Sequence, residues 1–244
     1  YDYCKQALLA GKNVLCETPF ILSVKQAEEL YTIAEGSNLV LMVALKTAYC
    51  PAFSHLYSLL KSGVIGDIVE INTSSTTLLE ESDYLVSKGR YGGSMVENGC
   101  FTLLPIIKFF GTDFKNINYY SRNVNNVDIF TKGVLRFEHA VASFQVGLGV
   151  KTEGNLVISG TKGYVYVPAP WWKTDYFEVR YEDQNLNKKY FYPFVGEGLR
   201  YEIKDFVSSV LSKEHVYPKL SKHEILAMCR VQEQYHSGVN VYNL

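Results

Sequence analysis

The chain has 244 residues, of which 47 % are hydrophobic and 20 % charged, and its formal net charge is −1. This length fits one large domain, or one domain and part of another, with an ordinary buried core. The lack of a basic cluster argues against a nucleic-acid partner, and no apolar run approaches the roughly 20 residues that cross a bilayer.

The N-terminal region alternates between helix and strand patterns. Apolar spacing and stop signals predict helices over residues 3–10 and 23–35, and buried strands over residues 13–16 and 39–45. Ser23 is expected to cap the second helix, with Gln26 at the capping-box position. This α-β-α-β order predicts a parallel sheet, the tail of a doubly wound domain. Because Tyr1 opens the chain within a helix pattern, we expect a trimmed chain.

After residue 46 the pattern changes to strands separated by turn signals, with a few helices. Helices are expected over residues 51–62, 97–110, 198–211 and 221–236. Strands are expected over residues 67–78, 117–124, 128–137, 140–147, 155–159, 163–167, 176–181 and 189–194. The predicted fold class is α+β: a mixed, largely antiparallel open sheet with helices on one face, over residues 47–244.

The usual signatures of nucleotide phosphate and metal sites are missing. No GxGxxG or GxxxxGK[ST] motif occurs, and the nearest glycine cluster, Gly147, Gly149 and Gly154, has the wrong spacing. The five cysteines have no CxxC pair, and no histidine has metal-ligand company, so we expect no metal site. Unpaired cysteines are typical of reduced thiols in a cytoplasmic protein.

Four short motifs follow one another along the first half of the chain. They read ALLAGKNVLCETPF (7–20), MVALKTAYCP (42–51), SGVIGDI (62–68) and GGSMVENGCF (92–101). In this order they resemble the Gfo/Idh/MocA oxidoreductases, whose patterns are AL-x-AGKHV-x-x-EKP, MVG-x-x-x-R-x-x-P, SG-x-IG-x-I and GG-x-L-x-D-x-G-x-H. The resemblance implies that residues 1–46 are the remnant of a dinucleotide-binding Rossmann domain and residues 47–244 a substrate-binding and dimerisation domain.

The resemblance also implies a cofactor, which is NAD or NADP in the whole protein. The strand that ends in Glu17, Thr18 and Pro19 would lie beside the nicotinamide, because open α/β sheets bind ligands at the carboxyl ends of their strands. Lys46, after the next strand, could approach a nucleotide or a substrate anion, or simply extend along the surface. Without a phosphate-binding loop, we expect this chain alone to bind neither nucleotide tightly.

Departures from the family pattern fall on its catalytic positions. The family's lysine, aspartate and histidine correspond to Thr18, Glu97 and Phe101. A dehydrogenase must move a proton from the substrate hydroxyl, and neither threonine nor phenylalanine is suited to that. Glu97 and Tyr91 are the predicted catalytic residues, as substitute proton carriers, although Glu97 could also simply stabilise the positive end of its helix.

Substrate contacts are expected from two places. On the helix that follows the glycine pair, Asn98 and Phe101 are predicted to touch substrate, with a core position as the alternative for Phe101. In residues 167–173 two prolines precede Trp171 and Trp172, which cannot both face one core from an extended chain. A sugar-stacking surface and a packed loop anchor are both open for them.

Two functions remain open from the sequence. The first is an NAD(P)-dependent oxidoreductase that acts on a sugar or nucleotide-sugar hydroxyl, present here as a chain that is inactive by itself. The second is a catalytically degenerate relative that serves as a ligand-binding or dimerisation module. In both, an open sheet face rich in Tyr, Phe and Val predicts a homodimer or higher oligomer.

Overall fold

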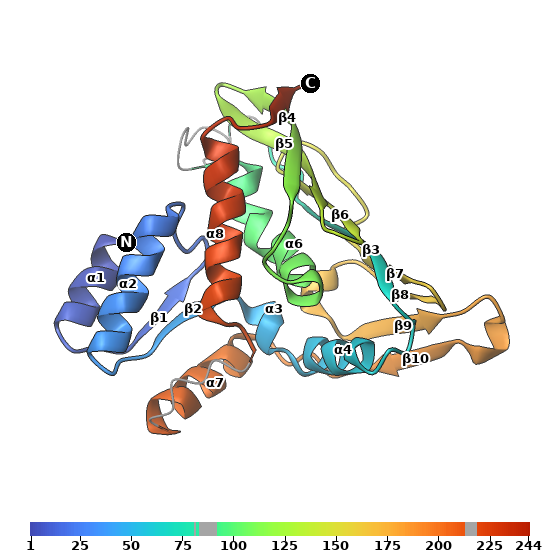
Figure 1. Ribbon diagram of the computed structural model, residues 1–244, viewed down its shortest axis with the longest axis horizontal. Coiled ribbons are helices and arrows are strands. Elements are labelled where there is room, and N and C mark those ends of the chain that lie inside the picture. Colours follow the sequence, from blue (N-terminus) through green and yellow to red (C-terminus); the bar gives the residue numbers. More distant parts are fainter. Residues whose placement is uncertain (81, 83–91, 213–218) are drawn as a thin grey trace.

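The computed structural model describes residues 1–80, 82, 92–212 and 219–244 (Figure 1). Its N-terminal part contains α1 (Asp2–Leu9), β1 (Val14–Glu17), α2 (Val24–Gly36) and β2 (Leu41–Ala44). The two strands pair in parallel, with Glu17 opposite Ala44 at their carboxyl ends. The predicted α-β-α-β order is therefore confirmed.

The start of α2 differs from the expected capping box. Ser23 has the extended backbone of a cap residue, but its side chain caps nothing among the described residues. Instead, the backbone N–H of Val24 donates to Glu233 of a distant helix at 3.2 Å. A tertiary contact thus satisfies this end of the helix, which the local pattern could not predict.

Two helices lead out of the small sheet. The short α3 (Lys46–Tyr49), which the sequence did not predict, follows β2 at once, and α4 (Pro51–Lys61) begins at a proline. Tyr49 folds back and donates a hydrogen bond to the carbonyl of Val43 at 3.0 Å. This contact holds α3 against the end of β2.

A large mixed sheet forms the second part of the protein (Figure 1). Its strands are β3 (Ile68–Thr76), β4 (Asn116–Val124), β5 (Val127–Arg136), β6 (Val141–Gly147), β7 (Leu156–Gly160), β8 (Tyr164–Val167), β9 (Tyr176–Arg180), β10 (Lys188–Phe191) and β11 (Val241–Asn243). The spatial order is β10-β9-β8-β7-β3-β6-β5-β4-β11. The pairs β3–β6 and β11–β4 are parallel and the others antiparallel, as the predicted class requires.

One face of this sheet is covered and the other is open. Residues paired on neighbouring strands form a row of side chains across the covered face. Every residue in this row is buried: Val179, Val165, Ile158, Ile71, Ala142, Leu135 and Ile117. The adjacent row on the outer face is half-buried throughout: Glu178, Tyr166, Val157, Asn72, Ser143, Val134 and Asn118. This strict alternation is typical of a sheet with helices on one side.

Helices α6 (Ser94–Phe110) and α8 (Lys222–His236) pack on the covered face and on each other (Figure 1). Ser221 and Glu224 form a capping box at the start of α8. Helix α7 (Leu199–Ser212) lies apart from the sheet and contacts α3. Lys222 of α8 reaches Glu35 at the end of α2 at 2.9 Å, so α8 also contacts the N-terminal part.

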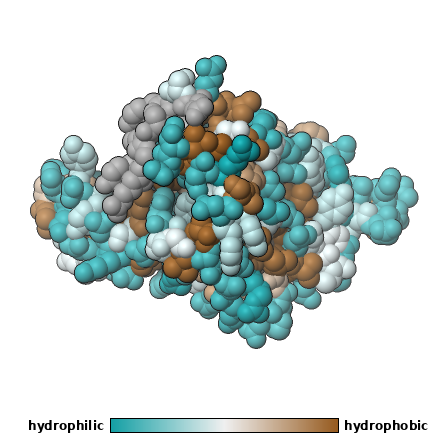
Figure 2. All heavy atoms as spheres, turned by 90° about the horizontal axis from the view of Figure 1, so that it is seen from above, coloured by the Kyte–Doolittle hydropathy of each residue, from teal (hydrophilic) through white to brown (hydrophobic). Residues whose placement is uncertain are grey.

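The outer face is more polar than expected. Its centre holds a groove of about 180 Å³ lined by Asn72, Ser74, Ser143, Gln145, Glu153 and Asn155. Aromatic side chains flank this groove on β8 and β9, where Arg180 lies over the rings of Tyr164 and Tyr166. On the side of the molecule shown in Figure 2, apolar residues form separate groups among hydrophilic ones. None of the helices that the structure describes has the length and apolar character to cross a membrane.

Candidate functional site

The carboxyl ends of β1 and β2 form one wall of the candidate site. Glu17 ends β1 and is exposed, Thr18 is half-buried, and the Thr18–Pro19 peptide is cis. Lys46, half-buried at the start of α3, lies just beyond the end of β2. The structure therefore brings the predicted cofactor-binding residues to one edge of the small parallel sheet.

The start of α6 is anchored by an aspartate that the sequence analysis did not single out. Asp128, at the start of β5 and 5 % exposed, accepts hydrogen bonds from the hydroxyl of Ser94, from the backbone N–H of Met95 at 2.9 Å and from Thr131 at 3.2 Å. Burial raises the pKa of Asp128 to about 6, although these donors act in the opposite direction. A carboxylate from a neighbouring strand thus caps the helix.

The close approach of Asp128 also explains why a glycine precedes α6 at position 93. Gly93 has a φ of +104°, and a Cβ there would lie 2.1 Å from Oδ1 of Asp128. Only glycine allows this backbone conformation and this close approach together. The helix consequently begins at Ser94, three residues before the predicted start at Glu97.

Three predicted site residues lie on the first turns of α6. Glu97 and Asn98 are half-buried, and the Oδ1 atom of Asn98 accepts a hydrogen bond from Ser75 at 3.2 Å. Phe101, one turn later, is also half-buried and packs against the core. Tyr91, the other predicted proton carrier, lies outside the described residues.

The two tryptophans have different environments. Trp171 is 0 % exposed, and its ring N–H donates to the carbonyl of Ser74 at 3.0 Å, so it is the packed anchor of its loop. Trp172 is half-buried, with its ring 6.5 Å from that of Trp171 and nearly perpendicular to it. The hydroxyl of Thr47 donates to the carbonyl of Trp172 at 2.8 Å, which joins this loop to α3. Of the pair, Trp172 is the ring that a ligand can reach.

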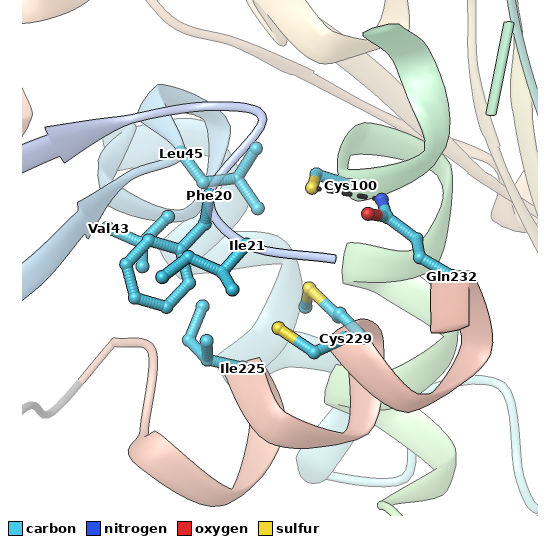
Figure 3. A pocket seen from close by; sticks show the side chains of 9 residues that line it. Phe20, Ile21, Val43, Leu45, Cys100, Ile225, Cys229 and Gln232 are labelled. Carbon is cyan, nitrogen blue, oxygen red and sulfur yellow. Dashed lines mark hydrogen bonds between the residues drawn. The ribbon is translucent and has the colours of Figure 1, made fainter. Parts of the chain in front are cut away.

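Behind the Glu17–Pro19 segment lies a small apolar cavity (Figure 3). Phe20 and Ile21, which directly follow this segment, line the cavity. Cys100 lines it from α6, and Ile225 and Cys229 line it from α8. The side-chain amide of Gln232 donates to the sulfur of Cys100 at 3.3 Å. The cavity volume of about 10 Å³ holds at most one water, so this space packs the site from behind and does not bind substrate.

A buried glutamate from α7 completes the site, and no local sequence signal marked it. Glu202 is 1 % exposed, whereas its neighbours Ile203 and Val207 are 49 % and 46 % exposed. Its Oε2 atom is buried without a hydrogen-bond partner among the residues described. Burial, and then the charge of Glu17, raises the pKa of Glu202 to about 7, against the opposing effect of Lys46.

The cysteines and metal-binding residue types add no further chemistry to this region. Burial raises the pKa of Cys50, next to α3, to about 12, and it also raises the pKa values of Cys100 and Cys229. Such thiols are poor nucleophiles. In the part of the chain that the structure describes, no group of three or more His, Cys, Asp or Glu side chains could hold a metal ion.

Comparison with known families assigns both parts of the chain. Residues 1–45 match the oxidoreductase family with an NAD-binding Rossmann fold, and residues 53–166 match the GFO/IDH/MocA C-terminal domain. The chain belongs to the Gfo/Idh/MocA family. The members of this family are NAD(P)-dependent oxidoreductases, and the resemblance drawn from the four motifs is confirmed.

Among curated Gfo/Idh/MocA relatives are trans-1,2-dihydrobenzene-1,2-diol dehydrogenases. The rabbit (Oryctolagus cuniculus) enzyme is 29 % identical over 236 residues, which cover 90 % of this chain and 70 % of the relative. The human (Homo sapiens) enzyme is 28 % identical over 234 residues, with coverages of 90 % and 69 %.

Solved structures share the fold at lower identity. KijD10, a 3-ketoreductase from Actinomadura kijaniata solved with NADP and TDP-benzene, superimposes with a TM-score of 0.85 at 21 % identity. The match covers 100 % of this chain and 76 % of KijD10. An NAD binding oxidoreductase from Klebsiella pneumoniae gives a TM-score of 0.81 at 18 % identity, with coverages of 95 % and 73 %.

Proposed function

We propose that this chain is part of an enzyme that uses NAD or NADP to interconvert a hydroxyl and a carbonyl group on a sugar-like small molecule. The observation that carries the proposal is the edge formed by Glu17, Thr18 and Lys46, in a chain of the Gfo/Idh/MocA family. The dihydrodiol dehydrogenase and 3-ketoreductase activities named for its relatives support the reaction class.

The residues present fit the nicotinamide end of such a cofactor. An exposed carboxylate, a hydroxyl and an ammonium group at this edge supply acceptors and donors for ribose hydroxyls and a carboxamide. The sequence offers no glycine-rich turn for the pyrophosphate. When bound, the cofactor supplies hydride transfer. We therefore propose that Glu17, Thr18, Pro19 and Lys46 hold its nicotinamide half, and that this chain alone binds it weakly.

The substrate would lie between this edge and the first turns of α6. The bond from Ser75 orients the Asn98 amide, which leaves its nitrogen as a donor toward a substrate oxygen. Trp172 and Phe101 offer aromatic surfaces against which a sugar ring can stack. Glu97, in the first turn of α6, and Tyr91 remain our proposed proton carriers.

A second candidate function has its own observation in favour. The positions of the family's catalytic lysine and histidine hold Thr18 and Phe101, so the whole protein could bind ligand without turnover. In that case the fold would serve as a ligand-binding or dimerising module. The two candidates share the cofactor edge and differ only in chemistry.

Titration calorimetry with NADH and NADPH decides whether the edge binds nucleotide. We expect heat of binding from the whole protein, including any residues that precede Tyr1, and weak or no binding from the 244-residue chain. Glu17→Gln removes the exposed carboxylate of the edge, and Glu28→Gln on the exposed face of α2 is its matched control. Absence of heat with both nucleotides in the whole protein would exclude the oxidoreductase proposal. Binding without turnover of sugars, sugar nucleotides or diols would favour the degenerate module.

Association and location complete the proposal. We propose a homodimer or higher oligomer through the outer sheet face, supported by the exposed Tyr164 and the half-buried Tyr166 beside its polar groove. Light scattering at high protein concentration tests the proposed association, and a monomer mass at that concentration would contradict it.

We propose a cytoplasmic location because the five cysteines show no pairing pattern. We also propose that residues 1–46 are a Rossmann-domain remnant and that residues 47–244 are a substrate-binding and dimerisation domain.

A further inference from the structure

The buried carboxyl group of Glu202 is the polar feature of the site that has no structural explanation. Its Oε2 atom meets no hydrogen-bond donor in the described part of the chain, although the residue is 1 % exposed. An ionised carboxylate in such a place loses its hydration without a compensating hydrogen bond to this oxygen. Burial therefore favours the neutral, protonated form.

The position of Glu202 links it to the cofactor edge. Helix α7 packs on α3, whose first residue is Lys46, and Cys50 directly follows α3. The charged groups that act on Glu202 are Glu17 from β1 and Lys46 from α3. Burial favours the protonated form of Glu202, Glu17 adds to this effect, and Lys46 opposes it.

The two carboxyl groups have opposite surroundings. Glu17 is exposed at the end of β1, whereas Glu202 is enclosed. Of two nearby carboxyl groups that differ in this way, the enclosed one favours its protonated form. The charge of Lys46 also acts on Glu197, which forms an ion pair with Lys173 at 2.6 Å. With Glu202 neutral, Glu17 and Lys46 therefore offset each other, as do Glu197 and Lys173, and these groups together carry no net charge.

We propose that Glu202 is a positioning residue that holds a proton and thereby sets the net charge of the cofactor edge. The inference rests on the proposed function, because it assigns the charge that a bound nicotinamide would meet. Loss of the proton from Glu202 to solvent leaves one uncompensated negative charge next to Glu17 and Lys46. An oxidised nicotinamide ring is cationic and a reduced ring is neutral, so this charge favours the oxidised nucleotide.

The consequence is a coupling between pH and the oxidation state of the preferred nucleotide. At acidic pH the edge is neutral and does not discriminate by charge. As the pH rises through neutrality, the edge becomes negative and retains the oxidised form better. Proton release and binding of the oxidised cofactor therefore support each other, as linkage requires.

The first test needs no nucleotide. Infrared difference spectra of the 244-residue chain between about pH 5 and about pH 8 report protonated buried carboxyl groups as they ionise. Asp128 contributes a band of its own, so the assignment depends on the difference between the unmodified chain and Glu202→Gln. We expect one band to disappear in Glu202→Gln and to remain in the control Glu28→Gln. Retention of every band in Glu202→Gln would overturn the proposal.

A second variant keeps this test valid if Glu202→Gln fails to fold. Glu17→Gln removes an exposed charge that favours the proton on Glu202. We expect the midpoint of the Glu202 band to move to lower pH in Glu17→Gln and to stay in place in Glu28→Gln. An unchanged midpoint in Glu17→Gln would show that the two carboxyl groups are not coupled, which contradicts the proposal.

The second test measures the oxidised and reduced nucleotides against the whole protein. The ratio of the dissociation constant of the reduced form to that of the oxidised form should rise about threefold or more between about pH 6 and about pH 8, and should stay flat in Glu202→Gln. A rise of equal size in Glu202→Gln would assign the effect to another group and overturn the proposal. Failure of both nucleotides to bind would refute the proposed function, while the infrared result would still decide the protonation of Glu202.

Discussion

Two buried carboxyl groups, Asp128 beside the start of α6 and Glu202 on α7, differ in how they are satisfied. Asp128 receives hydrogen bonds from Ser94, Met95 and Thr131, whereas Oε2 of Glu202 receives none from any residue that the structure describes. A saturated buried carboxylate holds structure together, and an unsaturated one costs stability. Asp128 therefore has a structural role, whereas Glu202 lowers stability and its presence is better explained by a role in function.

The largest effect is expected from adding a methyl group beside Asp128. In Gly93→Ala the new Cβ would lie 2.1 Å from Oδ1, at a φ of +104°. Displacement of the cap and backbone strain together should lower the free energy of unfolding by about 3–4 kcal/mol, as measured by urea denaturation.

Gly63→Ala is the matched control for that change. Gly63 also has a positive φ, of +75°, but a Cβ there meets no described atom within 4 Å. We expect a loss of about 1 kcal/mol in this control, from the backbone conformation alone. Equal losses at the two glycines would mean that contact with Asp128 is unimportant.

Removal of the Asp128 carboxyl group should cost somewhat less. Asp128→Ala leaves the hydroxyls of Ser94 and Thr131 and the N–H of Met95 without their acceptor, and we expect a loss of about 3 kcal/mol in urea denaturation. Asp128→Asn keeps one acceptor oxygen and should lose about half as much. A loss below 1 kcal/mol for the alanine variant would contradict the capping role.

Glu202→Gln should change how stability depends on pH. Since the folded-state pKa of Glu202 is raised to about 7, its contribution to stability is fully present below the unfolded-state pKa and is lost as pH rises through about 7. The unmodified chain should therefore lose up to about 3 kcal/mol between about pH 4 and pH 8 through this group. Glu202→Gln should lack this loss and gain stability relative to the unmodified chain at alkaline pH.

The pH dependence of Asp128 complicates this measurement in a predictable way. The pKa of Asp128 is raised to about 6, so stability is also lost as pH rises through about 6. In urea titrations at several pH values, the loss through Asp128 should end near about pH 6 and the loss through Glu202 near about pH 7. Glu202→Gln should therefore lack the loss between about pH 6 and pH 7. Persistence of that loss in the variant would place the proton on another group.

The smallest effect is expected at Lys46. Its charge opposes protonation of Glu202, and the side chain is half-buried. Lys46→Met should shift the Glu202 titration to higher pH while changing the free energy of unfolding at acidic pH by less than about 1 kcal/mol. Carbon-13 NMR of labelled glutamate carboxyl groups would follow the shift, and a movement to lower pH would contradict the assigned charge arrangement.

Most of the fold was predictable because periodicity and turn residues are local signals. The α-β-α-β opening and the antiparallel run of strands followed from apolar spacing and glycine stops. Among the α-helices and strands that the structure describes, α3 and β11 were missed. Both are short. α3 is held to β2 by the hydrogen bond from Tyr49 to Val43, whereas β11 exists through its pairing with β4, about 120 residues earlier in the chain. A sequence window of ten residues contains no information on such a distant pairing.

The site was predictable only where motifs carried it. Glu17, Thr18 and Pro19 came from a motif at a strand end, and Gly93 from the glycine pair before α6. Asp128 and Glu202 could not be found, because each lies far along the chain from the residues it serves. In α7 the pattern itself misleads, since an apolar residue such as Ile203 is exposed and Glu202 is buried. Burial of a charged residue is decided by tertiary packing, here against α3.

The parallel pairing of β3 with β6 has a consequence for how the site assembles during folding. Their partners, such as Glu70 and Val141, are about 70 residues apart in the chain, and α6 lies within the intervening segment. Closing so long a loop is slow, because its entropic cost must be met before the contacts form. The helix that carries Glu97, Asn98 and Phe101 therefore reaches its final position only when the central strands join. The site and the sheet should consequently form in one cooperative step, and amide protons of α6 should exchange through global unfolding.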